Sequence, residues 1–433
     1  KGPALQSQEG HFGIWNGISK AFMDLFLPLG YPHSVDPSYL PYQLYDGLQG
    51  LCSYWRGVVA TQAVLKAAGV GDAQATAASA AVQWALRDGT GMVGGLVLSY
   101  IASPYFDTHV KEFRLFADVI NDVALTLDML APHVGSDWRL WILCLSTIGK
   151  TLCGMSAGAT KGRITQHFSR HGNMADLSAK ESTQETLVSL LGMIGGVLVA
   201  QLLQTMPYAF TWILFGILTI VHVWANYKGV KVLKFATLNQ ERTVGVLRDV
   251  IQVLMDEKGK DELDKTLQHL PTPEDIDESL ASSTWKLLFP TLHVDSPIEA
   301  KHFAFATEFI NERYIIGEKK GQLYIHLALG ATSRDELVAF THGLLLQEII
   351  ASKEMTINVN LVTTTRKQIS RLYRSTGIGE GKEQRPGLWD LLETKGWDLQ
   401  GRLYLGFGSG RVDLSIIDEK ETKTSLSHKK KSL

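Results

Sequence analysis

Residues 208–227 read YAFTWILFGILTIVHVWANY and contain no formally charged side chain. A helix of about 20 apolar residues is long enough to cross the hydrocarbon core of a bilayer, and Tyr and Trp favour its two interfaces. The stretch therefore predicts a transmembrane helix. The competing interpretation is a helix that is buried on all sides in a large water-soluble core.

Four further apolar stretches precede it in the chain. They are residues 187–204 without charge, 141–159 with Lys150, 47–65 with Arg56, and 73–103 with the adjacent pair Arg87 and Asp88. Their length, and their richness in Ala, Gly, Leu and Val, favour helices over strands. We therefore predict a mainly α protein with a helical membrane core of about five to six long helices and a smaller C-terminal α+β domain.

The composition changes after residue 235, and this change gives the predicted domains. The segments are an N-terminal segment 1–37, the helical core 38–235, an amphipathic helix and acidic linker 236–284, a soluble α+β domain 285–415, and a polar, disordered tail 416–433. Within the α+β domain we expect a hairpin around EKKG, residues 318–321, and a helix that begins at an N-capping Ser333. We also expect a short strand at TINVNLV, residues 356–362.

Residues 112–130 predict an amphipathic helix. Apolar side chains recur every three or four positions from Phe113 to Leu130 and form one stripe. The opposite face carries four polar side chains, Arg114, Asp118, Asn121 and Asp122. If the helix lies on a surface, this face is solvated; if other helices enclose it, the carboxylates line a wet cavity, and such carboxylates usually have a function. The sequence leaves both interpretations open.

A short sequence occurs twice, as GMVGG at residues 91–95 and as GMIGG at residues 192–196. At the same offset of 101 positions, ten residues are identical between residues 51–95 and 152–196. The count does not decide between an internal duplication and a bias towards Gly and Ala. If each copy held three helices, the second would insert upside down, as in many transporters.

The G-x-x-x-G spacing within these strings removes side chains from one helix face and so lets another helix approach closely. We expect helix packing at three such pairs, Gly91 and Gly95, Gly154 and Gly158, and Gly192 and Gly196. Polar residues also recur at helical spacing in residues 173–187. They indicate either a binding face or a hydrogen-bonded helix contact.

The candidate cavity or binding residues are therefore the charged and amide side chains next to the apolar stretches. They are Arg87, Asp88, Arg114, Asp118, Asn121, Asp122, Asn173, Asp176, Lys180, Glu181 and Glu185. An inverted duplication would bring Arg87 and Asp88 and the group around Lys180 close to one central site.

Catalytic motifs are poorly matched. GMSAG, residues 154–158, fits G-x-S-x-G, but Ser156 lies in a helical run with no preceding strand. His167 and His171 are four positions apart, yet their neighbours are basic and do not favour a cation; a patch for anionic lipid headgroups fits better. We expect a protein that is not an enzyme, with no cofactor and no metal.

The overall charge limits the partners. The 433 residues carry a formal charge of -2, which argues against nucleic acid as a partner. The three cysteines lie in apolar segments and indicate buried thiols rather than a disulfide framework. Membrane lipid is the partner that the apolar stretches predict, and the ligand, if there is one, is an unknown small molecule.

Several motifs together resemble the root UVB sensitive protein family, which is also described as a domain of unknown function. They include PLGYPHSVDPSYLPYQLYDGLQ (residues 28–49), FRLFADVINDVALTLDMLAP (113–132), GNMADLSAKESTQETL (172–187) and THGLLLQE (341–348). The polar candidate residues match polar positions of the family motifs. Gly95 departs from them, because relatives tend to have an arginine after the second small residue, and this puts Gly95 in doubt as a shared functional position.

The resemblance implies membrane association and offers no catalytic residues to carry over. Plant members are linked to ultraviolet-B responses in roots, auxin transport, vitamin B6 status and pairing between paralogues in plastids. We therefore expect a homo-oligomer or a hetero-oligomer with a family paralogue, acting in small-molecule transport or partner binding. The alternative is a peripheral or soluble sensor or cofactor-handling protein.

The expected location is an intracellular membrane. Pairing in plastids favours the plastid, whereas the C-terminal KKSL, with Lys430 and Lys431, fits a dilysine retrieval signal and favours the endoplasmic reticulum.

Overall fold

A computed structural model gives the fold. It describes residues 20–67, 77–257, 259–280, 292–294, 305–309, 311–353, 355–374, 386–400, 403–407 and 411–412. The chain divides into two compact units, Lys1–Leu233 and Lys234–Leu433. The predicted polar tail and the first 19 residues of the predicted N-terminal segment lie outside the described residues.

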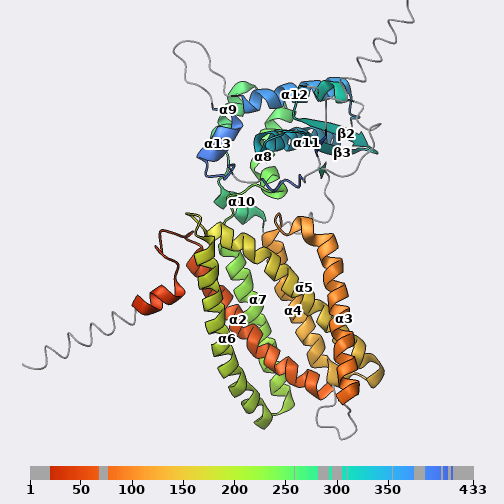
Figure 1. Ribbon diagram of the computed structural model, residues 1–433. Helices are drawn as coiled ribbons and strands as arrows, with labels where there is room; N and C mark the ends of the chain where they lie inside the picture. The colour runs from red at the N-terminus through yellow and green to blue at the C-terminus, as the bar shows by residue number, and fades with distance from the viewer. Residues whose placement is uncertain are drawn as a thin grey trace, which may run out of the picture. The chain divides into compact units, whose positions relative to one another are not determined.

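Six long helices make up most of the described part of the first unit (Figure 1). They are α2 (Tyr39–Ala67), α3 (Ala77–Ala102), α4 (Val110–Leu130), α5 (Ser136–Phe168), α6 (Met174–Thr205) and α7 (Tyr208–Val232). By length and composition, α5, α6 and α7 are able to cross a membrane. The prediction of a helical core with apolar helices is confirmed.

The surface of the first unit is apolar. Among the residues that the structure describes, all but three of the exposed large hydrophobic side chains belong to this unit. Met92, Leu96 and Ile220 are examples, with 68%, 72% and 72% of their area exposed. Such a surface is unfavourable in water and is expected for a helical bundle in lipid.

Helix α4 also turns apolar side chains outward and polar side chains inward, which is the inverse of a helix on the surface of a water-soluble protein. Phe116, Val123 and Leu130, from the predicted apolar stripe, are exposed. Asp118 and Asp122, from the polar face, are buried. Of the two interpretations that the sequence left open, the structure therefore supports a polar face enclosed by other helices.

The helices of the first unit pack in an interlaced way. α2 packs along α6 and α7, whereas α5 packs along α3 and α4. The glycine strings lie in these contacts. A Cβ on Gly91 would lie 2.8 Å from the Thr151 hydroxyl oxygen, and one on Gly192 would lie 2.7 Å from Cγ of Tyr54, so each glycine permits a close approach.

The remaining glycines of the strings extend the same contacts: Gly95 faces Met155 and Gly196 faces Val58. The third predicted pair behaves differently. No atom lies within 4 Å of a Cβ built on Gly154 or Gly158, so this pair does not mark a helix crossing among the described residues.

The second unit combines helices with a small sheet. Its helices are α8 (Gln240–Met255), α9 (Lys260–Gln268), α10 (Pro273–Leu280), α11 (Ser333–Lys353), α12 (Val359–Tyr373) and α13 (Leu388–Thr394). Its strands are β1 (Leu292–Val294), β2 (Tyr314–Lys319), β3 (Gln322–Ala328) and β4 (Arg411–Val412). The predicted α+β domain is confirmed, and α8 contributes Leu247 and Val250 to its core.

The sheet is built around β3. β2 pairs with β3 in antiparallel register from Tyr314 opposite Leu327 to Lys319 opposite Gln322, and β1 and β4 pair with β3 in parallel. Lys320 and Gly321 form the turn of the β2–β3 hairpin, both with positive φ, as a two-residue hairpin loop requires. The predicted hairpin around EKKG is therefore correct.

Two local predictions in this unit are wrong. Residues 356–362 are not a strand, because the Asn358 side chain accepts a hydrogen bond from the Leu361 N–H and so caps α12, which begins at Val359. α11 begins at Ser333 as expected, but Thr332 is its cap: the Asp335 carboxylate accepts a hydrogen bond from the Thr332 N–H at 2.8 Å, as in a capping box.

Candidate functional site

The centre of the first unit holds a buried ion cluster in which three helices meet. Arg56 of α2 is fully buried, and its Nη2 lies 2.5 Å from Oδ1 of Asp122 on α4. His222 of α7, also fully buried, places its Nδ1 3.0 Å from the same carboxylate oxygen. The Arg56 guanidinium also donates to the Thr219 hydroxyl at 3.2 Å and lies over the Phe215 ring. This arrangement links α2, α4 and α7.

A second ion pair extends the cluster by about two turns along α4. The Arg114 guanidinium donates to Oδ1 of Asp46 at 2.6 Å and lies 3.5 Å from Oε1 of Gln49, both on α2. Asp118 lies between Arg114 and Asp122 in sequence and is 5% exposed. Its Oδ2 is buried without a hydrogen-bond partner among the described residues.

The cluster carries an excess of negative charge. We define the central cluster as Asp46, Arg56, Arg114, Asp118, Asp122 and His222. Two guanidiniums face three carboxylates, so with a neutral imidazole the formal charge is 2 − 3 = −1. An uncompensated charge is costly in a low-dielectric interior, so the cluster favours a proton or another cation.

A small polar pocket adjoins the cluster. Its lining includes Asp46 and Arg114, together with Lys161, Thr165 and Glu181. The Thr165 hydroxyl donates to Oε2 of Glu181 at 2.7 Å. The free space is about 30 Å³, enough for one or two water molecules. The cluster is thus connected to a charged pocket near the C-terminal end of α5.

A wider groove runs beside α2 and reaches α4 and α5. It has a volume of about 570 Å³, and its lining includes Ser53, Gly57, Asn121 and Lys150. Lys150 forms an ion pair with Asp128, whose side chain is almost completely buried. The groove therefore offers hydroxyl, amide and ammonium groups in a unit whose outer surface is apolar.

The predicted residues fall into two groups. Arg114, Asp118 and Asp122 belong to the central cluster, Glu181 and Glu185 line the adjoining pocket, and Asn121 donates to the Ser53 hydroxyl at 3.3 Å in the groove. The structure thus brings together the candidates on α4 and two on α6.

The other candidates lie apart from this cluster. Arg87 is buried on α3 and donates to the Thr147 hydroxyl, whereas Asp88 is exposed. Asn173, Asp176 and Lys180 hydrogen-bond main-chain atoms of Ser34, Leu29 and Asp24 respectively. These three residues hold the chain segment before α2 against α6, so neither the pair Arg87 and Asp88 nor Lys180 belongs to the central cluster.

Sequence reasoning missed four residues, Arg56, His222, Asp46 and Tyr42, of which the first three are in the cluster and Tyr42 lines the pocket. The signal was present for two of them. Arg56 is the only charge in 47–65 and His222 is the only imidazole in 208–227. A lone ionisable group in an apolar stretch of membrane-spanning length needs a partner inside the bundle. Arg56 and His222 share the same partner, Asp122.

Other catalytic arrangements do not have the required geometry. The Ser38 hydroxyl lies 3.2 Å from Nε2 of His167, but Asp36 faces this same nitrogen at 3.7 Å rather than Nδ1, so the order of a catalytic triad is not met. Ser156 is buried in the middle of α5, without a strand-turn-helix elbow.

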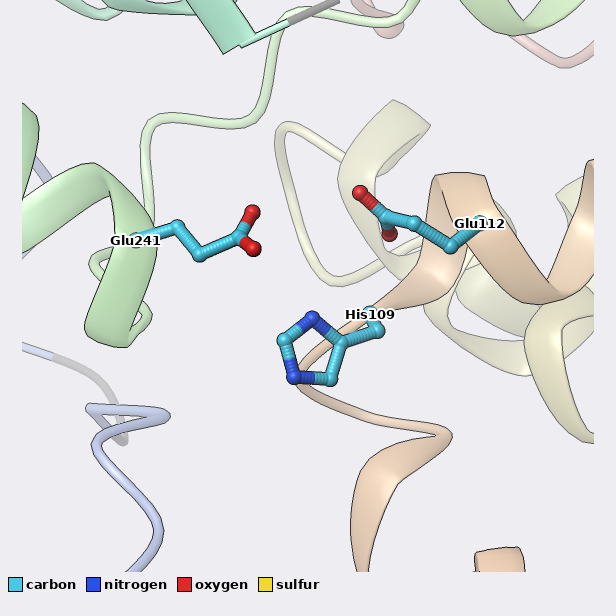
Figure 2. A group of neighbouring side chains, drawn as sticks. All are labelled: His109, Glu112 and Glu241. Carbon is cyan, nitrogen blue, oxygen red and sulfur yellow. The ribbon is translucent and has the colours of Figure 1, made fainter. Parts of the chain in front are cut away.

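Figure 2 shows His109, just before α4, and Glu112, in the first turn of α4, together with Glu241 from the first turn of α8. Because Glu241 belongs to the second unit, these residues are not assigned to one site.

The sequence is similar to known proteins over most of its length. Residues 14–253 match a family model described as a vitamin B6 photo-protection and homoeostasis domain. The chain is 32% identical over 347 residues to "Protein root UVB sensitive 3" of Arabidopsis thaliana, which covers 78% of this chain and 77% of the relative. It is 38% identical over 239 residues to "RUS family member 1" of Dictyostelium discoideum, covering 55% of this chain and 45% of that relative.

A third relative is named "Protein root UVB sensitive 2, chloroplastic", from Arabidopsis thaliana, with 30% identity over 236 residues, covering 54% of this chain and 53% of the relative. No solved structure matches the chain. The matched region of the family model contains all six helices of the first unit and therefore the whole central cluster.

Proposed function

Because this chain belongs to the root UVB sensitive family, we propose that it is a polytopic protein of an intracellular membrane whose first unit moves a small polar solute. The observation that carries the proposal is the inversion of α4, with Asp118 and Asp122 inside the bundle and Val123 outside it. Water would favour the opposite orientation of this helix. Lipid favours the observed one, since the bilayer solvates the apolar stripe and the bundle solvates the carboxylates.

Transport fits the central cluster better than a purely structural role does. A structural ion pair is satisfied by its partner, whereas Asp118 Oδ2 and His222 Nε2 are buried and unpartnered among the described residues. Ionisable residues of this kind inside membrane bundles mark solute and ion pathways. The groove beside Asn121 and Lys150 supplies the space for a small polar molecule.

The proposed role is not enzymatic. We also propose that the chain assembles with a second copy of itself or with a family paralogue. The description of the family model in terms of vitamin B6 makes pyridoxine and pyridoxal the first solutes to test. Their hydroxyl groups and ring nitrogen suit a groove lined by hydroxyl, amide and ammonium groups. A relative named as chloroplastic supports a plastid membrane as the first location to examine.

The first experiment asks whether the full chain is integrated in a membrane. Membranes from expressing cells are washed with alkaline carbonate, and we expect the chain to stay in the pellet. Release into the wash would contradict the proposal and favour a peripheral sensor or cofactor-handling protein.

The second experiment measures uptake of labelled pyridoxine and pyridoxal into vesicles that contain the full chain. We expect uptake to be lost in Asp122→Asn and kept in Asp88→Asn, a matched change at an exposed carboxylate of the same unit. Equal uptake by empty vesicles and by vesicles with wild-type protein would refute transport of these solutes.

A further inference from the structure

The two halves of the first unit correspond helix by helix. Adding 101 to the bounds of α2 (39–67) gives 140–168, and α5 spans 136–168. The same shift takes α3 (77–102) to 178–203 and α4 (110–130) to 211–231, close to the bounds of α6 (174–205) and α7 (208–232). The correspondence thus extends beyond the glycine strings to α4 and α7, which contain neither of these strings.

Corresponding helices run in opposite directions. The Asp36 N–H, before α2, donates to the Phe168 carbonyl at the end of α5, and the Arg139 guanidinium, at the start of α5, donates to the Ala67 carbonyl at the end of α2. His133, after α4, lies 2.6 Å from the hydroxyl of Tyr208, the first residue of α7. The start of a helix in one copy therefore lies next to the end of the corresponding helix in the other copy, as in an antiparallel pair.

The packing is nearly unchanged when the two copies are exchanged. The contact of α2 with α6 becomes that of α5 with α3, and the contact of α2 with α7 becomes that of α5 with α4. The glycine contacts follow this rule, because Gly91 and Gly95 pack on α5 as Gly192 and Gly196 pack on α2. α4 and α7 correspond to each other, and their contact lies on the axis of the exchange.

The central cluster sits at this axis. Asp122 and His222 differ by 100 positions and so occupy near-equivalent places on α4 and α7, where they contact each other at 3.0 Å. Thr219, which accepts a hydrogen bond from Arg56, corresponds to Asp118 at the offset of 101. The cluster's single excess negative charge therefore lies where the two copies meet.

The largest departure from this symmetry involves α2 and α4. These helices pack together, but α5 and α7 make no comparable contact among the described residues; smaller contacts of α6 with α5 and α7 also lack a comparable counterpart there. In transporters built from inverted repeats, one repeat moves against the other around a fixed site, and this alternation carries the solute across the membrane.

We infer that residues 39–130 and 136–232 are an inverted three-helix repeat, and that binding of one proton to the central cluster on its axis exchanges the α2–α4 and α5–α7 contacts. This inference rests on the proposed transport function and assigns the proton as the coupling ligand. A proton fits because the cluster carries one excess negative charge and the buried Oδ2 of Asp118 has no hydrogen-bond partner among the described residues.

The groups that face the proton site come from four helices. α2 contributes Arg56 and Asp46, and α4 contributes Arg114 and Asp118 beside Asp122. α7 contributes His222. α5 contributes the Cys153 thiol, which lies within electrostatic range of Asp118 and Asp122. Arg56 of α2 pairs with Asp122 of α4, and Arg114 of α4 pairs with Asp46 of α2, so these two ion pairs hold α2 on α4. Loss of the excess charge by protonation weakens the attraction of Arg56 for the carboxylates of α4.

Distance measurements between spin labels on the full chain in lipid test the inference. The natural cysteines are replaced, and labels are placed at Leu65 and Leu130 to report on α2 and α4. The equivalent positions, 101 further on, are Gln166 and Lys231, which report on α5 and α7; all four side chains are exposed. When the pH is lowered, we expect the first distance to increase and the second to decrease.

The chain supplies a matched control. Val123 and Trp224 are both exposed and correspond to each other at the offset of 101, so exchange maps this pair onto itself. Its distance should not change. Asp118→Asn, which removes the excess charge permanently, should hold both reporter distances at their low-pH values.

The outcomes separate this inference from the proposed function. Distances that are insensitive to pH, or that change in the same direction, overturn the inference even if the chain is membrane-integrated and transports a solute. If the two distances change in opposite directions with sodium concentration at constant pH, the coupling ligand is a metal cation and the inference of a proton is wrong. Opposite changes that follow pH support the inference whichever solute is transported.

Discussion

The buried imidazole of His342 makes the second unit sensitive to acid. His342 lies on α11 and is fully buried, with Nδ1 2.9 Å from the Tyr314 hydroxyl and Nε2 2.9 Å from the Thr365 hydroxyl. Burial, which disfavours the charged form, lowers the pKa of His342 from 6.5 to about 3, and the nearby Arg366 acts in the same direction. The folded unit therefore keeps this histidine neutral.

The pKa difference gives both the sign and the size of the effect. As the pH falls below 6.5, the unfolded chain takes up a proton that the folded chain refuses, so the stabilisation is complete above pH 6.5 and is lost progressively towards pH 3. Each pH unit in this window lowers the free energy of unfolding by about 1.4 kcal/mol. Between pH 6.5, where the unfolded imidazole is already half-protonated, and about pH 4.5, before most carboxylates titrate, the expected loss is about 2.3 kcal/mol.

Hydrogen exchange of the β3 and α11 amides in the full chain measures this loss, once the observed rates are corrected for the pH dependence of intrinsic exchange. His342→Gln is the matched variant, because it keeps groups able to hydrogen-bond Tyr314 and Thr365 but does not titrate. Burial raises the pKa of Glu312, which gives a pH dependence of the opposite sign, and the difference between wild type and variant removes this contribution. Equal pH dependence in the two proteins would refute the reasoning.

Two further predictions concern the first unit. In Gly195→Ala the new Cβ would lie 2.6 Å from Nε1 of Trp55, so thermal unfolding in lipid discs should show a loss of about 1–3 kcal/mol, whereas Gly158→Ala, with no atom within 4 Å, should show little change. Arg56→Met leaves the buried Asp122 without its guanidinium partner and should lower the free energy of unfolding by about 3–5 kcal/mol. The loss should be smaller when Arg56→Met is combined with Asp122→Asn. A double variant whose loss equals the sum of the two single losses would contradict a direct interaction.

Helix α4 shows how far the sequence leads and where it stops. The three-and-four spacing from Phe113 to Leu130 correctly predicts one apolar and one polar face. Which face points outward depends on the solvent, and periodicity carries no information about the solvent. The sequence therefore left both orientations open, and only the packed structure places Asp118 and Asp122 inside.

The central cluster was predictable in part. Arg114, Asp118 and Asp122 share one face of one helix, so their proximity follows from helix geometry. Arg56 lies about 60 positions before them in the chain and His222 about 100 positions after them, and no local pattern shows which distant helix packs on α4. The alternation in residues 356–362 misled for a simpler reason: Asn358 hydrogen-bonds the main chain locally and starts a helix, overriding β-propensity.

The interlaced packing of the first unit constrains how the protein is made. Tyr54 and Trp55 fill the glycine face of α6, yet Gly192 is synthesised 138 positions after Tyr54. α2 and α3 therefore leave the ribosome long before the helices against which they pack exist. In the proposed membrane setting, lipid or the insertion machinery covers their contact faces in the interval, and the native bundle closes only after α6 and α7 have entered the bilayer. A chain that stops short of α6 leaves Tyr54 and Trp55 of α2 without the glycine face on which they pack.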